Sequence, residues 1–182
     1  MLARELTREG FDVLGIDPSP AMIDIARRTA AGARFELGSF ASCATPPCAA
    51  VTAIGEVLNY GRRKDLPSFF QRAAHARMLV FDIAERGSYP PHDERRIGGD
   101  DWSVIAIKDS DGARVTRRIL TFREIAGETR RSEEVHTLEL YDRDEVLQML
   151  RDAGFSARVR RSYGAHRLPQ GHSVYIATRK ER

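Results

Sequence analysis

The fold is decided by the stretch FDVLGIDPSPAM, residues 11–22, in which a short apolar run ends in a carboxylate and turns directly into a helix. A nearly continuous apolar run is typical of a strand buried in a parallel sheet. Ligands of such sheets bind beyond the carboxyl ends of the strands. Asp17 stands at that point, where a carboxylate can accept hydrogen bonds from both hydroxyls of a ribose. Ser19 is the expected N-cap of the helix, and Pro20 its first residue. The stretch predicts a nucleoside-binding strand end.

Strands and helices alternate along the first half of the chain. We expect helices at 2–9, 20–30 and 66–75, and strands at 11–16, 33–37, 50–55 and 78–83. Such alternation favours a parallel sheet with both faces covered.

A second pattern begins after residue 83. Residues 84–101 are polar and rich in Gly and Pro, which predicts a loop long enough to be a functional lid. Three strand-like runs follow at 102–108, 113–125 and 128–141, separated by short turn sequences. This spacing predicts an antiparallel meander. A helix through Arg151 and strands at 157–163 and 173–178 are expected to end the chain.

Four segments together resemble the class I S-adenosylmethionine-dependent methyltransferases, in the branch that acts on small molecules. Residues 2–10 resemble the helix after the family's glycine-rich loop, and residues 17–22 its ribose-binding turn. Residues 38–40 stand where the family has its adenine-binding turn, with Ser39 in place of the usual Asp. Residues 53–60 resemble the segment that lines the methionine end of the cofactor and the substrate mouth.

The resemblance implies one Rossmann-like α/β domain over 1–182, a doubly wound sheet closed by a C-terminal antiparallel hairpin, with residues 102–141 as a three-stranded antiparallel insertion. It implies S-adenosyl-L-methionine as the cofactor. The cofactor-binding residues that it implies are Asp17, Pro18, Ser19, Met22, Ser39, Phe40, Gly55 and Glu56.

The family's first, central strand and its glycine-rich loop would precede Met1. We therefore expect the chain as given to bind the cofactor poorly and to self-associate through unpaired strand edges. An upstream strand and loop should restore binding.

Methyl transfer from a sulfonium requires mainly orientation and desolvation, because the cofactor is already activated. A base is needed only if the acceptor nitrogen or oxygen carries a proton at attack, and Glu56 and His136 are the candidates. Tyr60 and Trp102 are candidate contacts for a small-molecule acceptor. No metal is required.

Composition limits the remaining classes. The 26 acidic and 29 basic residues give a net charge of +3 and are interspersed, which does not indicate a nucleic-acid surface. The sequence contains no run of 18 or more apolar residues that would indicate a membrane span, and it opens with no leader that would indicate export. We therefore expect a cytoplasmic protein. Only three of the basic residues are Lys, which hints at a bacterium with a GC-rich genome.

Two other functions remain open. A nicotinamide-dependent oxidoreductase would also place Asp17 at a second strand end, but it does not explain the turn at residues 17–22. A non-catalytic remnant or binding module is suggested by the absent glycine-rich loop.

Overall fold

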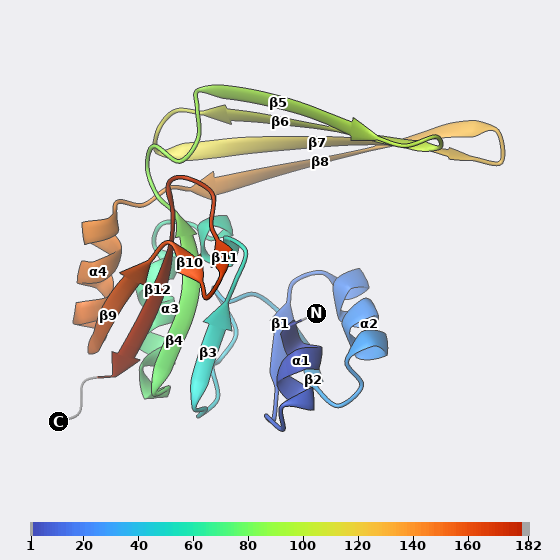
Figure 1. Ribbon diagram of the computed structural model, residues 1–182. Coiled ribbons are helices and arrows are strands. Elements are labelled where there is room, and N and C mark those ends of the chain that lie inside the picture. The colour runs from blue at the N-terminus through green and yellow to red at the C-terminus, as the bar shows by residue number, and fades with distance from the viewer. Residues whose placement is uncertain (1, 180–182) are drawn as a thin grey trace. The chain divides into compact units, whose positions relative to one another are not determined.

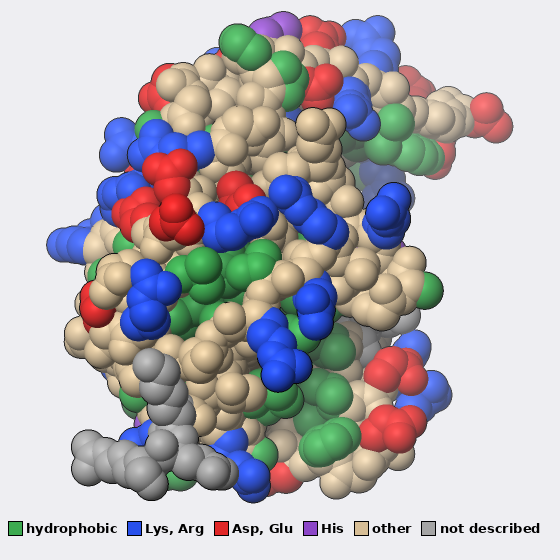
Figure 2. All heavy atoms as spheres, turned by 60° about the vertical axis from the view of Figure 1, so that its left-hand side comes forward, with side chains coloured by type: hydrophobic (Ala, Val, Ile, Leu, Met, Phe, Trp, Pro, Cys, Tyr) green, Lys and Arg blue, Asp and Glu red, His purple; other side chains and the backbone are tan. Residues whose placement is uncertain are grey.

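The computed structural model describes residues 2–179, and the chain divides into two compact units, Met1–Thr45 and Pro46–Arg182 (Figure 1). Each unit is described by itself. The expectation of a single domain over the whole chain stays a prediction. Among residues 2–179, no helix is long and apolar enough to cross a membrane. On the face in Figure 2, acidic and basic side chains are interspersed, as their order in the sequence suggests.

The first unit contains the strand end on which the sequence analysis is based. Its elements are α1 (Leu2–Arg8), β1 (Leu14–Asp17), α2 (Pro20–Thr29) and β2 (Arg34–Leu37). β1 and β2 are parallel, with Asp17 opposite Leu37 at their carboxyl ends. Ser19 caps α2, because its Oγ accepts a hydrogen bond from the Met22 N–H at 3.3 Å, and Pro20 begins the helix. The predicted cap and helix start are confirmed, whereas the strand runs over Leu14–Asp17 instead of 11–16 and none of its residues is fully buried.

The second unit is built on a four-stranded sheet with the order β3-β4-β12-β9. β3 (Ala50–Ala53) and β4 (Met78–Ala84) are parallel, whereas β12 (His172–Arg179) is antiparallel to both β4 and β9 (Phe155–Arg160). The expected C-terminal hairpin is therefore confirmed. Among the described residues this sheet and the β1–β2 pair are separate, and the missing strand between them stays a prediction.

Short elements complete this unit: the 3-10 helices η1 (Val57–Tyr60) and η2 (Ala73–His75), the helices α3 (Asp65–Arg72) and α4 (Arg143–Asp152), and the small hairpin β10 (Ser162–Tyr163) and β11 (His166–Arg167). The core lies between the helices and the sheet. Phe70 of α3 and Leu150 of α4 are fully buried, and the Phe81 and Tyr175 rings stack with centroids 5.1 Å apart. Aromatic burial of this extent is a main stabilising contribution of the unit.

The insertion has four strands, and our expectation of three strands at 102–141 was wrong. β5 (His92–Gly98), β6 (Trp102–Ser110), β7 (Arg114–Ile125) and β8 (Glu128–Glu139) form one antiparallel sheet in that order. β5 lies in the segment that we expected to be a loop. Its sequence, HDERRIG, has almost no apolar alternation because it is an edge strand, where charged residues discourage further pairing.

Asn59 fastens this insertion to the core sheet. The side chain is fully buried, and its Nδ2 donates to the backbone oxygens of Ala84 and Glu139, at 3.0 and 2.6 Å. Its Oδ1 accepts from the Ala84 N–H at 3.0 Å. One amide thus joins the end of β4 to the end of β8, which fixes the base of the insertion beside the carboxyl ends of β3 and β4.

Candidate active site

Asp17 presents one carboxylate oxygen for a ligand at the end of β1. Its Oδ1 accepts a hydrogen bond from the Ser19 N–H at 2.8 Å, which fixes the orientation of the half-buried carboxylate. Within residues 2–179 no donor to Oδ2 is found. Met22, in the first turn of α2, is half exposed. The turn is therefore oriented by the protein and retains acceptor capacity.

The turn after β2 is closed by Ser39. Its Oγ accepts from the Ala41 N–H at 3.2 Å, and its backbone oxygen accepts from Cys43 N–H at 2.8 Å. A Cβ at Gly38 would collide with Cys43 Sγ, so the present position of the Cys43 side chain depends on glycine at this point. Ser39 has a structural role in this turn, and Phe40 follows it, half buried.

In the second unit the chain turns sharply where β3 ends. Gly55 and Glu56 have φ angles of +92° and +61°, in the left-handed region that non-glycine residues rarely adopt. Asp82 on the neighbouring β4 accepts both of their N–H groups, from Gly55 at 2.7 Å and from Glu56 at 3.0 Å. Tyr163 donates its hydroxyl to the same carboxylate at 2.9 Å. This turn places the Glu56 side chain at the carboxyl edge of the parallel pair.

Glu56 is the centre of a cluster that we call the Glu56 network. Its Oε1 accepts from His172 Nε2 at 2.8 Å and from the Tyr89 hydroxyl at 3.0 Å, and its Oε2 accepts from Arg117 Nη2 at 3.0 Å. Arg117 also donates to the Tyr60 hydroxyl at 3.0 Å and to the Tyr89 hydroxyl at 3.2 Å. The network comprises Glu56, Tyr60, Tyr89, Arg117 and His172.

The charges of the network are fixed by its hydrogen bonds. Burial raises the pKa of Glu56, but the hydrogen bond from His172 and the charge of Arg117 outweigh burial and lower the pKa to about 2. Burial lowers the pKa of His172, but the hydrogen bonds to Glu56 and to the Gln170 oxygen raise it overall. Both ring nitrogens of His172 face acceptors, an arrangement that favours the imidazolium form.

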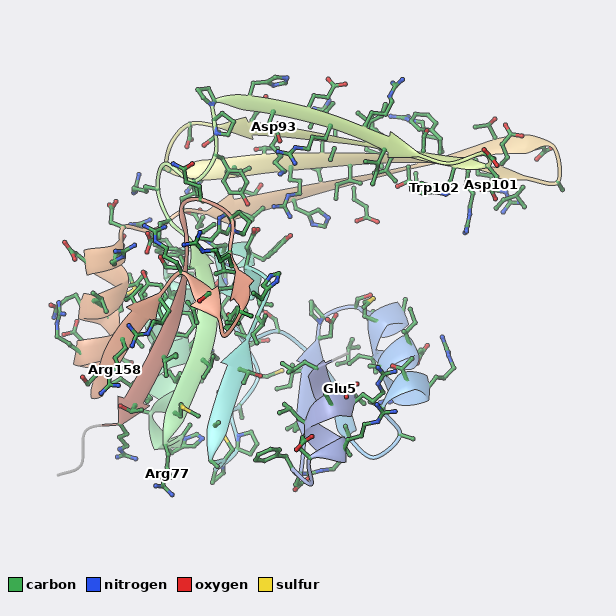
Figure 3. All side chains as sticks on the ribbon, in the orientation of Figure 1. Glu5, Arg77, Asp93, Asp101, Trp102 and Arg158 are labelled. Carbon is green, nitrogen blue, oxygen red and sulfur yellow. The ribbon has the colours of Figure 1, made fainter. Side chains whose placement is uncertain are left out.

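Tyr60 and His136 lie at the edge of the network, whereas Trp102 does not. The Tyr60 and His136 rings meet edge to face with centroids 5.7 Å apart, and His136 is opposite Arg117 in the β7–β8 register. On β6, Lys108 is the residue opposite Arg117, and Trp102 lies six residues before it. Six residues of an extended strand span about 20 Å. Figure 3 shows Trp102 at the outer end of the insertion.

Tyr89, Arg117 and His172 were not among the site residues predicted from the sequence. Tyr89 lies in the segment that we expected to be a loop, and Arg117 is one of several alternating arginines of the meander. The available signal was at His172, which directly precedes the apolar run SVYIA. Because that strand is antiparallel to β4, its first residue lies at the carboxyl end of β4.

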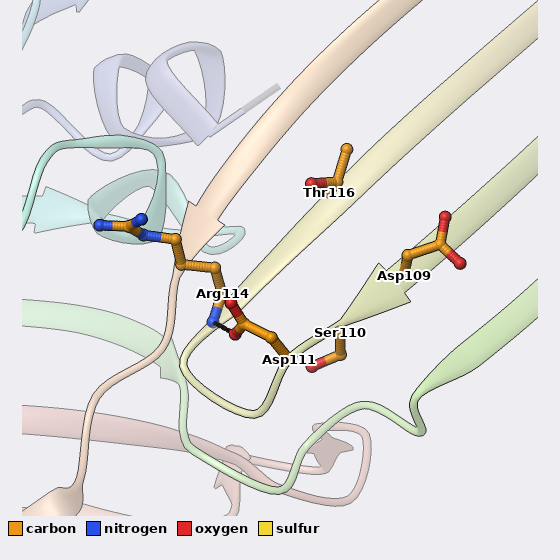
Figure 4. Close-up of a pocket in the computed structure, with 5 residues that line it drawn as sticks. All are labelled: Asp109, Ser110, Asp111, Arg114 and Thr116. Carbon is orange, nitrogen blue, oxygen red and sulfur yellow. Dashed lines mark hydrogen bonds between the residues drawn. The ribbon is translucent and has the colours of Figure 1, made fainter.

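A cavity of about 330 Å³ lies elsewhere, at the β6–β7 turn (Figure 4). It is lined by Asp109, Ser110, Asp111, Arg114 and Thr116. Asp111 Oδ1 accepts the backbone N–H groups of Ala113 and Arg114 at 2.8 and 2.7 Å, so this carboxylate closes the turn. Asp111 thus has a structural role in the turn.

No family model matches the sequence, and no curated protein matches it. Solved structures do match the fold. An S-adenosylmethionine-dependent methyltransferase from Clostridium acetobutylicum is 14% identical, with a TM-score of 0.82 over 98% of this chain and 81% of that one. The sugar N-methyltransferase KedS8 from a Streptoalloteichus species is 18% identical, with a TM-score of 0.81 over 99% and 75%.

A third neighbour is CalS10, an amino pentose methyltransferase from Micromonospora echinaspora, solved with S-adenosylmethionine bound. It is 18% identical, with a TM-score of 0.76 over 97% of this chain and 78% of that one. The chain therefore has the fold of S-adenosylmethionine-dependent small-molecule methyltransferases, which confirms the fold class predicted from the sequence.

Proposed function

We propose that this protein transfers the methyl group of S-adenosylmethionine to a nitrogen or oxygen of a small polar acceptor, such as a sugar. The observation that carries the proposal is the extent of the fold likeness. It covers 97 to 99% of the chain in three methyltransferases, and therefore includes the insertion as well as the sheets. Two of these neighbours are described as sugar or amino pentose methyltransferases.

The residues of the first unit fit the nucleoside end of the cofactor. Asp17 Oδ2 is available to the ribose hydroxyls, because the Ser19 N–H holds only Oδ1. Pro18 and Met22 would contact the ribose side, and Ser39 and Phe40 the adenine side. Ser19 would contribute backbone only, since its hydroxyl caps α2. When bound, S-adenosylmethionine supplies an electrophilic methyl group on a charged sulfur.

Gly55 and Glu56 would border the reacting end, and the network would orient the acceptor there. Glu56, with a pKa of about 2, is a weak base at neutral pH, and both ring nitrogens of His172 already face acceptors within the protein. We therefore assign Glu56 an electrostatic role and Tyr60, with its exposed ring, a role in acceptor contact. His136 remains the candidate base of the site, beside Tyr60.

Titration with S-adenosylhomocysteine tests the cofactor assignment. It is done on the 182-residue chain and on the longest in-frame product that contains it. In the form that binds, Asp17→Ala should weaken binding about thirty-fold or more, since it removes charge-assisted hydrogen bonds of about 2 to 4 kcal/mol in total. Asp24→Ala, on the exposed side of α2, is the matched control and should leave affinity unchanged.

Two further measurements on the same protein separate the alternative functions. Affinity for a nicotinamide dinucleotide instead would indicate an oxidoreductase. Binding without methyl transfer to any of a panel of amino and hydroxy sugars would indicate a binding module. A loss of affinity below three-fold in Asp17→Ala would contradict the ribose assignment.

A further inference from the structure

Glu56 has a backbone conformation that its residue type disfavours. Its φ of +61° lies in the left-handed region, and it follows Gly55 at φ +92°. A non-glycine residue retains such a conformation only where its surroundings impose it, and such residues cluster at functional sites. The question is therefore which group imposes the turn.

Asp82 is that group. It is only 3% exposed, and all three donors to its carboxylate are uncharged: the N–H groups of Gly55 and Glu56 and the hydroxyl of Tyr163. Of the charged residues that the structure describes, none forms an ion pair with it. A buried carboxylate without a cation is costly, and hydrogen bonds to uncharged donors must offset the cost.

The geometry requires a carboxylate at this position. Asp82 Oδ1 accepts from Gly55, and Oδ2 accepts from Glu56, so both oxygens face an N–H group. An amide would turn its own NH₂ toward one of these donors. With the turn released, Glu56 would rotate to a negative φ and its Cβ would change direction. The side chain would then leave Arg117, Tyr89 and His172.

We propose that Asp82 is a positioning residue: its carboxylate fixes the left-handed Gly55–Glu56 turn and thereby aims the Glu56 side chain at Arg117, Tyr89 and His172. Tyr163 supports the carboxylate from the β10 hairpin. The edge of the core sheet and the insertion consequently present one preformed polar wall. This inference extends the proposed function, in which Glu56 borders the acceptor.

The pKa of His172, followed by NMR of its ring, reports whether Glu56 is in place. The groups that face this ring are Glu56, Tyr89, the Gln170 oxygen and, through its charge, Asp82. Asp82→Asn therefore acts in two ways, by removing a charge and by releasing the turn. The measurement needs neither cofactor nor acceptor, so its failure leaves the proposed methyl transfer untouched.

A double-mutant cycle separates the two effects. Asp82→Asn should lower the pKa of His172 by about one unit or more in the native background, the shift expected for loss of a close ion pair. In a Glu56→Gln background the same change should have less than half of that effect, because the side chain that Asp82 aims has lost its charge. Equal effects in both backgrounds would mean that Asp82 acts by its own charge or through the fold alone, and would overturn the proposal.

A glycine pair gives a second test that changes no charge. Gly55 and Gly112 both have φ near +90°, and a Cβ at either would meet nothing within 4 Å, so alanine strains only the backbone. Gly55→Ala should lower the pKa of His172, whereas Gly112→Ala, in the β6–β7 turn, should leave it unchanged. Equal pKa values in the two variants would overturn the proposal, even if Asp82→Asn failed to fold.

Discussion

Two glutamates, Glu85 buried and Glu56 partly buried, stand near the carboxyl ends of adjacent parallel strands, and each is held by an arginine and a tyrosine. Glu56 follows β3 and is bound by Arg117, Tyr89 and His172. Glu85 follows β4 and receives a bidentate pair from Arg143, at 3.0 and 2.9 Å, together with the Tyr175 hydroxyl at 2.9 Å. The two clusters use the same chemistry but differ in their backbone and in what they join.

Glu85 has an ordinary backbone and joins core elements. Its φ is not positive, its N–H donates to the Gly171 oxygen at 2.9 Å, and its partners come from α4 and β12. Glu56 has a left-handed backbone, and its partners include β7 of the insertion and the segment before β5. Since strain is retained where function requires it, the difference suggests that the Glu85 cluster stabilises the fold and the Glu56 network serves the site.

The largest expected effect is on stability at Glu85. Glu85→Ala removes the carboxylate partner of Arg143 and leaves the fully buried hydroxyl of Tyr175 without its acceptor. Because the Arg143 side chain is 40% exposed and keeps a hydrogen bond to Ser173, the free energy of unfolding should fall by about 2 kcal/mol, measured by urea denaturation. Glu134→Ala, at an exposed position on β8, is the control and should cost less than about 0.5 kcal/mol. A loss below about 1 kcal/mol at Glu85 would remove the distinction between the clusters.

The difference in stability between a Gly variant and an Ala variant should be smaller than this effect and should have opposite signs at Glu56 and Glu85. At Glu56, the Gly variant should be more stable than the Ala variant by about 1 kcal/mol, because only Ala must adopt a positive φ at a cost. At Glu85, the Ala variant should be the more stable by about 0.5 to 1 kcal/mol, because its backbone is regular. Urea denaturation of the four variants measures both differences. The same sign at both positions would refute the claim that, of these two glutamates, only Glu56 has a strained backbone.

The pH dependence of stability should distinguish the clusters through His172. Its pKa is raised in the folded protein, so its contribution is fully present below about pH 6.5, the usual pKa of a free His, and is lost as the pH rises through the folded value. Unfolding free energies from pH 6 to 9 should therefore fall less in His172→Gln than in the native chain. His166→Gln, at an exposed position in the short strand β11, is the control. Equal slopes for the native chain and His172→Gln would show that the ring gains no proton on folding.

At acidic pH, the contribution of Glu56 to the free energy of unfolding should decrease. The folded pKa of Glu56, about 2, lies below its ordinary value of 4.5, so its contribution is present above pH 4.5 and is lost as the pH falls toward 2. The difference in unfolding free energy between the native chain and Glu56→Gln should shrink over that window. A difference independent of pH would contradict the ion pairs of Glu56.

Local patterns in the sequence predicted the elements that local physics determines. The apolar runs of β1, β4 and β12, the Ser19 cap and the carboxylates of Asp17 and Glu56 at strand ends all follow from burial periodicity and capping. The highly charged edge strand β5 could not be found in this way, because its sequence lacks the apolar alternation by which strands are recognised.

The network could not be assembled from local patterns either. Arg117 and His172 lie 61 and 116 residues from Glu56 along the chain, so only the sheet register brings them together. The sheet register also explains why Trp102 does not lie near the network. Its place at the start of a strand suggested a pocket edge, but the length of β6 carries it to the far end of the insertion.

The smallest expected effect is at Trp102, and it tests whether the acceptor site is confined to the Glu56 network. Tyr60 and Trp102 were equal candidates from the sequence, and both are about two-fifths exposed, at 44% and 40%. The Tyr60 hydroxyl accepts from Arg117 at 3.0 Å, so Tyr60→Phe removes a polar contact at the site and should raise the acceptor KM several-fold. Trp102 packs over Gly99 at the opposite end of β6, so Trp102→Ala should change the acceptor KM by less than two-fold and the unfolding free energy by less than about 1 kcal/mol. Steady-state kinetics of the two variants with one sugar acceptor measures the KM values, and urea denaturation measures the unfolding free energy. If Trp102→Ala had an effect as large as that of Tyr60→Phe, the acceptor site would extend along the insertion. The strands of the insertion could then no longer be divided into a functional part next to the core sheet and a structural part at the far end.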